Sequence, residues 1–280
     1  MSIKGNIKGI IINADDFGLT EGINRGIIDA FSQGIVTRAS IMPCAVGFNH
    51  AISLIKQNPG LNIGIHLTLV GEKPVSSRDK IGSLLEPDGA LYRNHRAFLL
   101  KYFSKKIKLD EISHEFECQI KKILDTGVKV NHMDSHQHLH MLPGIFELSI
   151  GLAKKYGIKN IRITRQNYLT IGSFREFALV AMNSLSLKQH KKKLSASDIC
   201  FTSNFWGFKK GGLIKEKDLL SFFDRIKPGI TEIMCHPGYS DQEYMRKYSF
   251  WGYNPDEELK ALTSQNVKNK LKDKGIELIS

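Results

Sequence analysis

Two adjacent carboxylates, Asp15 and Asp16, follow the apolar run Gly9–Ile12 in the stretch NADDFG. An apolar run of this kind is typical of a buried strand, so the pair is expected where the strand ends. Neighbouring carboxylates repel one another unless a proton or a cation lies between them. A divalent metal ion would meet that requirement, although a lone Asp-Asp pair is also common as a helix cap or a turn.

Histidines follow other apolar runs in the same manner. His66 lies in NIGIHLTL, His236 follows TEIMC and begins HPG, and HMDSHQHLH carries four histidines within nine residues. Taken singly, His66 could be a buried structural histidine and HPG a turn. One carboxylate with two imidazoles, however, is a donor set that leaves coordination positions open for water and substrate. The joint occurrence of these motifs at strand ends therefore predicts a metal-dependent site.

Short apolar runs alternate with helical patterns from one end of the chain to the other. The candidate strands are 9–15, 36–42, 62–68, 128–134, 159–164, 199–205, 230–236 and 276–279. Helical spacing occurs from Thr20 to Gly34, over 109–126, from Pro143 to Gly157, at 221–225 and from Pro255 to Lys272. This alternation predicts parallel strands covered by helices. Because no Gly-rich GxGxxG motif follows the first strand, a (β/α) barrel fits better than a dinucleotide-binding sheet.

We therefore expect an α/β fold, a distorted (β/α) TIM-like barrel of seven or eight mostly parallel strands. One domain would span 1–280, with insertions near 70–108 and 165–198 that are less regular and of the kind that carries binding function. In such a barrel the active site forms at the carboxyl ends of the strands. The carboxylates and histidines described above fall at those ends.

Composition restricts the class of protein further. The chain has 280 residues, a formal charge of +12, and basic runs at 101–108 and 188–193. These runs are read either as a nucleic-acid surface or as solvated basic faces, and we favour the second because no nucleic-acid-binding motif accompanies them. The four cysteines form no CxxC pair, and no apolar run approaches a membrane span. We expect a cytoplasmic protein without nucleic acid as a partner.

Four motifs, NADDFG, IGIHLTL, HMDSHQHLH and CHPG, occur in this order. Together they resemble the YdjC-like carbohydrate deacetylase family, which includes chitooligosaccharide deacetylases, and the likeness covers nearly the whole chain. The resemblance implies a distorted (β/α) barrel with one divalent metal ion, Mg²⁺ or Zn²⁺. It also implies hydrolysis of the N-acetyl group of an amino sugar, and assembly as a homodimer.

The resemblance assigns roles to individual residues. Asp16, His66 and His136 correspond to the metal ligands. By analogy with the related polysaccharide deacetylases, the first acid of the pair, Asp15, corresponds to the general base. His236 is then the candidate general acid, which would protonate the departing nitrogen.

Other polar residues near these motifs are candidates for supporting roles. Asp134 and His138 could orient the ligands through hydrogen bonds. Arg162 and Arg165 could orient Asp15, meet an anionic group of the substrate, or simply be surface charges. Trp206 could stack on a sugar ring or pack against the protein.

The motifs leave other functions open. The same metal chemistry would serve an amidase or a phosphoesterase acting on a substrate other than a sugar. A basic nucleic-acid-binding protein is the alternative that is not an enzyme. The sequence gives neither the sugar and its length nor the native metal.

Overall fold

The structure is a computed structural model, and it describes residues 8–164, 192–194, 197–202 and 204–280. The chain forms two compact units. The first comprises Met1–Ile41, Val46–Gly64 and Thr202–Ser280, and the second comprises Met42–Ala45 and Ile65–Phe201. Each unit has its own strands, helices and buried apolar side chains.

Parallel strands form the centre of the first unit. They are β1 (Lys8–Phe17), β2 (Arg38–Ile41), β6 (Asn204–Trp206), β7 (Gly229–Cys235), β8 (Glu277–Leu278) and the first residues of β3 (Asn62–Leu67). Their order is β3-β2-β1-β7-β6, and β8 also pairs with β1. The central strand β1 has Ile10 and Ile12 fully buried. A parallel strand covered on both faces requires such an uninterrupted apolar run.

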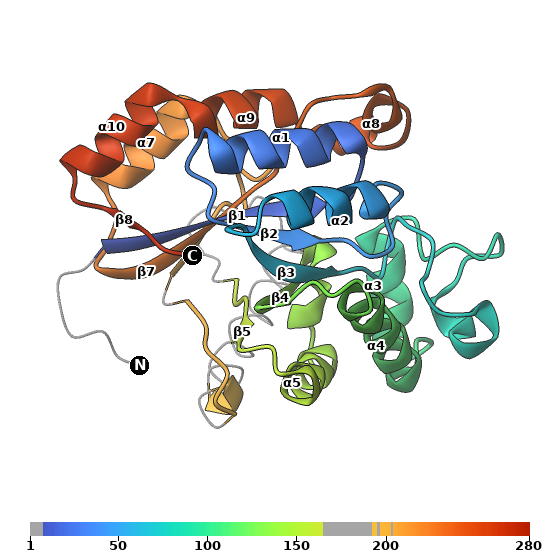
Figure 1. Cartoon of the computed structure of the whole chain (residues 1–280). Coiled ribbons are helices and arrows are strands. Elements are labelled where there is room, and N and C mark those ends of the chain that lie inside the picture. The colour runs from blue at the N-terminus through green and yellow to red at the C-terminus, as the bar shows by residue number, and fades with distance from the viewer. Residues whose placement is uncertain (1–7, 165–191, 195–196, 203) are drawn as a thin grey trace. The chain divides into compact units, whose positions relative to one another are not determined.

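Helices cover this sheet. They are α1 (Glu21–Ser32), α2 (Phe48–Gln57), α7 (Glu216–Asp224), α8 (Gln242–Lys247), α9 (Pro255–Thr263) and α10 (Gln265–Asp273), with a 3-10 turn, η5 (Ser249–Trp251). Figure 1 shows α1, α7, α9 and α10 along one face of β1 and β7. The side chain of Thr20 accepts a hydrogen bond from the backbone N–H of Ile23 and so caps α1, as its position before the apolar helical pattern predicts.

The second unit contains the end of β3 with β4 (His132–Ser135) and β5 (Asn160–Ile161), and β4 and β5 pair in parallel. Its helices are α3 (His95–Phe103), α4 (Leu109–Leu124) and α5 (Ile145–Tyr156), with 3-10 turns η1 (Arg78–Lys80), η2 (Gly82–Leu84) and η3 (His136–Met141). Each of the three α-helices places one fully buried phenylalanine in the core: Phe98, Phe116 and Phe146. The α5 helix ends at Gly157, in the left-handed conformation typical of a C-terminal cap.

The expected fold class, α/β with seven or eight mostly parallel strands, is confirmed. Several elements differ from expectation: the helical spacing did not predict α2, α3 or α8, and the stretch from Pro255 to Lys272 forms two helices. Ser264 interrupts it, and its side chain accepts from the N–H groups of Asn266 and Val267 to begin α10. Within the described ranges, every helix lacks the combination of length and apolar character that a membrane crossing needs. The prediction of a single domain stays a prediction, and most of the insertion near 165–198 lies outside the described residues.

Candidate functional site

A bulge in β1 carries the two adjacent carboxylates. Ala14 pairs with Ala39 of β2, but the next pair is Phe17 with Ile41, so three residues of β1 advance against two of β2. Asp16 has φ 62°, a left-handed conformation that Asp tolerates better than most residues. Side chains of consecutive strand residues normally point to opposite faces. The bulge allows Asp15 and Asp16 to line the same pocket of the first unit, here called the carboxylate pocket.

Asp15 is held by two neighbouring polar side chains. Its Oδ1 accepts from Nδ2 of Asn13 at 2.7 Å and from the hydroxyl of Ser40 at 3.4 Å. Asp15 is 1% exposed and Asp16 2% exposed. Two carboxylates this deeply buried in one pocket repel one another unless a cation or a proton compensates them. This pocket therefore fits a cation-binding or proton-transferring role.

His236 reaches the same pocket from β7. Ala14 pairs with Cys235, so Asp15 and His236 are the next residues of two neighbouring strands. The backbone N–H of His236 donates to Oε2 of Glu258 at 2.5 Å. Burial, together with the negative charge of Asp15, raises the pKa of Glu258 to about 8, against the effect of the backbone N–H donors around its carboxylate. Parallel pairing thus brings a carboxylate and an imidazole to one edge of the sheet.

The remaining wall of the carboxylate pocket is apolar and aromatic. It is formed by Leu19, Ile23, Tyr244, Trp251, Tyr253 and Pro255. Burial, and then the charge of Asp16, raises the pKa of Tyr244 to about 12. Sequence reasoning did not single out these aromatics or Glu258. For Trp251 and Tyr253, the signal that could have found them is the aromatic-rich stretch FWGYNP, which follows the HPG motif.

In the second unit, His66, Asp134, His136 and Arg162 form what we call the histidine cluster. Nδ1 of His66 lies 2.7 Å from Oδ1 of Asp134, and Nη2 of Arg162 lies 2.8 Å from Oδ2 of the same carboxylate. Although burial opposes it, the charge of Arg162 and the hydrogen bond with His66 hold the pKa of Asp134 well below its usual range. Asp134 is therefore an ionised carboxylate that only accepts hydrogen bonds.

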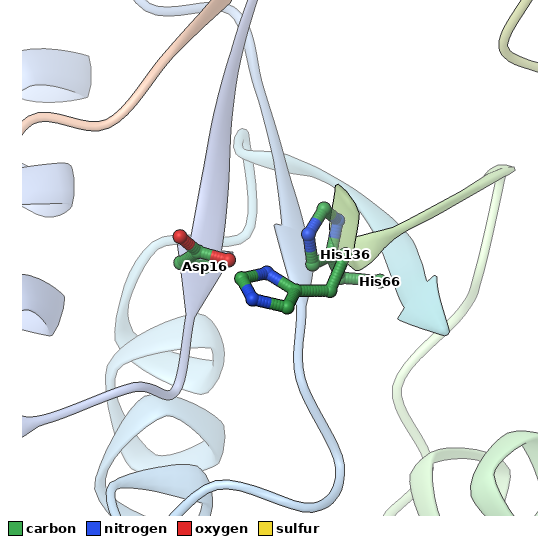
Figure 2. A group of neighbouring side chains, drawn as sticks. All are labelled: Asp16, His66 and His136. Carbon is green, nitrogen blue, oxygen red and sulfur yellow. The ribbon is translucent and has the colours of Figure 1, made fainter. Parts of the chain in front are cut away.

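This arrangement fixes the tautomer of neutral His66. Its Nδ1 must carry the proton that is donated to Asp134, so Nε2 keeps the lone pair that a metal ion binds. The ring of His136, at the start of η3, lies 5.7 Å from that of His66, at 70° between the ring planes. Figure 2 draws His66 and His136 with Asp16, and shows that the three come from β3, the residues after β4, and β1. A histidine that binds a metal ion through one ring nitrogen usually donates a hydrogen bond from the other ring nitrogen to a carboxylate.

Other histidines of HMDSHQHLH have different surroundings. The ring of His140 bonds on both sides, with Nδ1 at 2.6 Å from Oγ of Ser135 and Nε2 at 3.0 Å from the carbonyl of Arg162. Burial lowers its pKa to about 4, which suits a neutral structural histidine. His138 has φ 55° and is half-buried, and burial and then Arg162 lower its pKa well below the usual value.

Three further candidates complete the comparison with the sequence. Arg162 is buried against Asp134 rather than a surface charge. Trp206 packs on Phe222, with ring centroids 4.9 Å apart. Arg165 lies outside the described residues.

The parallel strands alternate with helices, and buried carboxylates and histidines lie at the carboxyl ends of these strands. This arrangement is that of the α/β enzymes whose active sites form at the carboxyl ends of the strands. The chain belongs to the YdjC-like protein family, whose model matches residues 9–273. It is 32% identical over 271 residues to a carbohydrate deacetylase of Thermoanaerobacter pseudethanolicus, with 96% of each chain covered. The family resemblance predicted from the motifs is confirmed.

Two more relatives extend this finding. A chitooligosaccharide deacetylase of Salmonella paratyphi B is 32% identical over 271 residues, with 95% of each chain covered. A crystal structure from Enterococcus faecalis, of a proposed cellobiose-phosphate cleavage protein, matches with a TM-score of 0.80 at 27% identity. That match covers 98% of this chain and 97% of the other. The likeness to the family therefore extends over nearly the whole chain.

Proposed function

We propose that this protein is a metal-dependent carbohydrate deacetylase, which hydrolyses the N-acetyl group of an amino sugar or its oligomer and releases acetate. Relatives named carbohydrate deacetylase and chitooligosaccharide deacetylase, similar over nearly the full chain, support the reaction. The observation in the molecule that carries the proposal is the hydrogen bond between His66 Nδ1 and Asp134 Oδ1. It prepares an imidazole for metal binding in a chain that also buries two adjacent carboxylates.

The metal ligands we propose are Asp16, His66 and His136. Each offers one donor atom, and each is buried. A set of one carboxylate and two imidazoles accepts Zn²⁺ and also Mg²⁺, and it leaves positions free for water and substrate. When bound, the ion would polarise the acetyl carbonyl and make a neighbouring water more acidic.

The proton transfers are assigned to the carboxylate pocket. Asp15 accepts the proton of the attacking water, and Asn13 and Ser40 hold its carboxylate in place. His236 donates a proton to the departing nitrogen, so that the products are acetate and a free amine. Because of the bulge in β1, the neighbouring residues Asp15 and Asp16 can both face the pocket. Asp16 can then serve as metal ligand and Asp15 as general base.

The test is a mass-spectrometric screen of N-acetylated sugars, from N-acetylglucosamine to its oligomers, with and without a chelator. We expect a loss of one acetyl group from at least one sugar, abolished by the chelator and restored by divalent metal. A parallel arm with aryl phosphate esters and simple amides tests the other metal hydrolases. Turnover of a phosphate ester with every sugar left intact would overturn the proposal.

We also propose that the protein acts in the cytoplasm as a homodimer and has no nucleic-acid partner. The dimer is the assembly that the family resemblance implies, and the basic residues of this chain occur without nucleic-acid-binding motifs. Light scattering at micromolar concentration should give twice the mass of the chain. A gel-shift assay at physiological salt should show free nucleic acid, and a retained complex would contradict this part of the proposal.

A further inference from the structure

Glu258 is a buried acid of the first unit that none of the sequence motifs contains. It lies near the start of α9 and is 0% exposed. Its Oε1 accepts the backbone N–H of Ile214 at 2.9 Å, and its Oε2 accepts the backbone N–H of His236 at 2.5 Å. One carboxylate therefore joins the residue at the end of β7 to the loop that precedes α7.

That loop forms one wall around the His236 ring. A Cβ atom added to Gly211 would lie 3.0 Å from Cε1 of His236, so the imidazole packs directly on the backbone there. On another side the ring of Tyr253 lies 4.9 Å from the His236 ring, centroid to centroid. Gly212, with φ +84°, packs on the Tyr253 ring, and its carbonyl accepts the N–H of Asn254 at 2.7 Å. The imidazole is thus packed between two segments, 211–214 and 253–254.

We infer that Glu258 is a positioning residue for His236: its carboxylate holds the His236 backbone and the 211–214 loop in one arrangement, and so sets where the imidazole lies in the carboxylate pocket. The inference rests on the proposed function in one respect, that His236 is the acid of the reaction. An acidic side chain suits this place because its two oxygens face two backbone N–H donors, and its ionised form accepts at both. Burying an acid away from water is unfavourable unless its hydrogen bonds are made, and here one is made to the backbone of His236 and the other to that of Ile214.

The variant that tests this role is Glu258→Gln. The amide has the same shape, but one of its two polar ends is a donor, so one of the two backbone N–H groups loses its acceptor. The matched control is Glu257→Gln, which removes the same charge from the same turn of α9. We expect kcat of the Glu258 variant to fall on the order of 10²-fold, because a displacement of about 1 Å is enough for such a loss. KM should stay within about twofold, since Glu258 acts through His236 and not on the substrate.

A second readout does not depend on activity. The His236 ring resonances, identified by their absence from the His236→Ala spectrum, should shift in Glu258→Gln and keep their positions in Glu257→Gln. Circular dichroism and metal content should match wild type in both variants. If wild type deacetylates no sugar, the proposed function fails, while the resonances still decide whether Glu258 positions His236.

Two outcomes would overturn the inference. One is a folded Glu258→Gln protein with wild-type kcat and unmoved His236 resonances. The other concerns Glu258→Asp, to be used if Glu258→Gln does not fold: this variant keeps the charge but is one methylene too short to reach both N–H groups. We expect it to fold and to lose kcat with KM retained. Wild-type kcat in Glu258→Asp would show that only the charge of the buried acid matters.

Discussion

Nδ1 of His66 and Oδ1 of Asp134 lie 2.7 Å apart, although 68 positions separate the two residues in the chain. Arg162 binds the other oxygen of Asp134, so the carboxylate is held ionised between a cation and an imidazole. The pair decides which nitrogen of neutral His66 keeps its lone pair. Asp134 of β4 thereby orients His66 of β3. Replacing Asp134 should therefore first lower the affinity for the metal ion.

We therefore predict that Asp134→Asn lowers metal affinity by about 10- to 100-fold, the usual effect of removing the support of a ligating histidine. Arg162 would then be buried beside a neutral amide, so the free energy of unfolding should also fall. Titration calorimetry with Zn²⁺ or Mg²⁺, at a temperature where the variant is folded, measures the affinity. Asp125→Asn, at an exposed position after α4, is the control. Unchanged affinity in Asp134→Asn would show that this carboxylate does not support the ligand.

The second prediction concerns His136. His136→Ala should lose bound metal and deacetylase activity while its circular dichroism spectrum stays that of wild type, because the residue is proposed as a ligand and not as a core contact. His114→Ala removes an exposed histidine of α4 and should retain both. Metal content is measured by elemental analysis after purification and dialysis. A His136→Ala protein with full metal occupancy would remove His136 from the ligand set.

The outcome at these residues shows which features the sequence could predict. The existence of β1, and so the place of Asp15 near its carboxyl end, followed from an apolar run that only a buried strand explains, although the strand continues two residues beyond Asp15, to Phe17. The caps at Thr20 and Gly157 followed from local backbone chemistry. Local rules carry no information on contacts between distant segments. The hydrogen bond from His236 to Glu258, 22 positions away, was therefore not predictable in the same way.

The bulge at Asp16 illustrates the same limit. Adjacent carboxylates at a strand end suggest chemistry, but whether both reach one pocket depends on the register with β2. A single sequence gives no register, because pairing partners are set by the fold and not by spacing along the chain. For Arg162, the sequence left three roles open; its burial excludes a surface charge, and the ion pair with Asp134 is a contact that none of the three anticipated.

The third prediction is a pH dependence of stability that arises from His140. Its pKa in the folded protein is lowered to about 4, while in the unfolded chain it is about 6.5, so the unfolded state binds more protons between these values. The contribution of His140 to the free energy of unfolding is therefore fully present above pH 6.5. It is lost as the pH falls toward 4, and the total loss is about 3 kcal/mol. Urea unfolding at pH 7 and at pH 4.5 measures the loss.

Glu258 has the opposite effect on stability. Its pKa in the folded protein is raised from 4.5 to about 8, so its contribution to stability falls as the pH rises between these two values. The test is therefore the difference between wild type and His140→Gln, which cannot gain a proton. We expect the variant to lose less stability than wild type between pH 7 and pH 4.5. Equal losses in the two proteins would show that His140 does not stay neutral in the folded state.

The last prediction separates the roles of the two adjacent acids, beginning with Asp16. Asn tolerates the left-handed conformation at this position as Asp does, so Asp16→Asn should keep the bulge. It replaces a charged ligand by a neutral one. We expect metal affinity to fall and excess metal to restore part of the rate, as titration followed by kinetics would show.

Asp15→Asn should fail in a different way. Its amide oxygen can still accept from Asn13, so the packing and the bound metal should remain. The amide cannot take the proton of water, and kcat should drop by roughly 10²–10⁴-fold with KM little changed, the usual contribution of a positioned general base. If Asp15→Asn loses the metal and Asp16→Asn keeps it, the two roles are reversed. If both variants keep metal and full activity, neither acid takes part in the reaction, and the bulge in β1 is only a structural feature of the strand end.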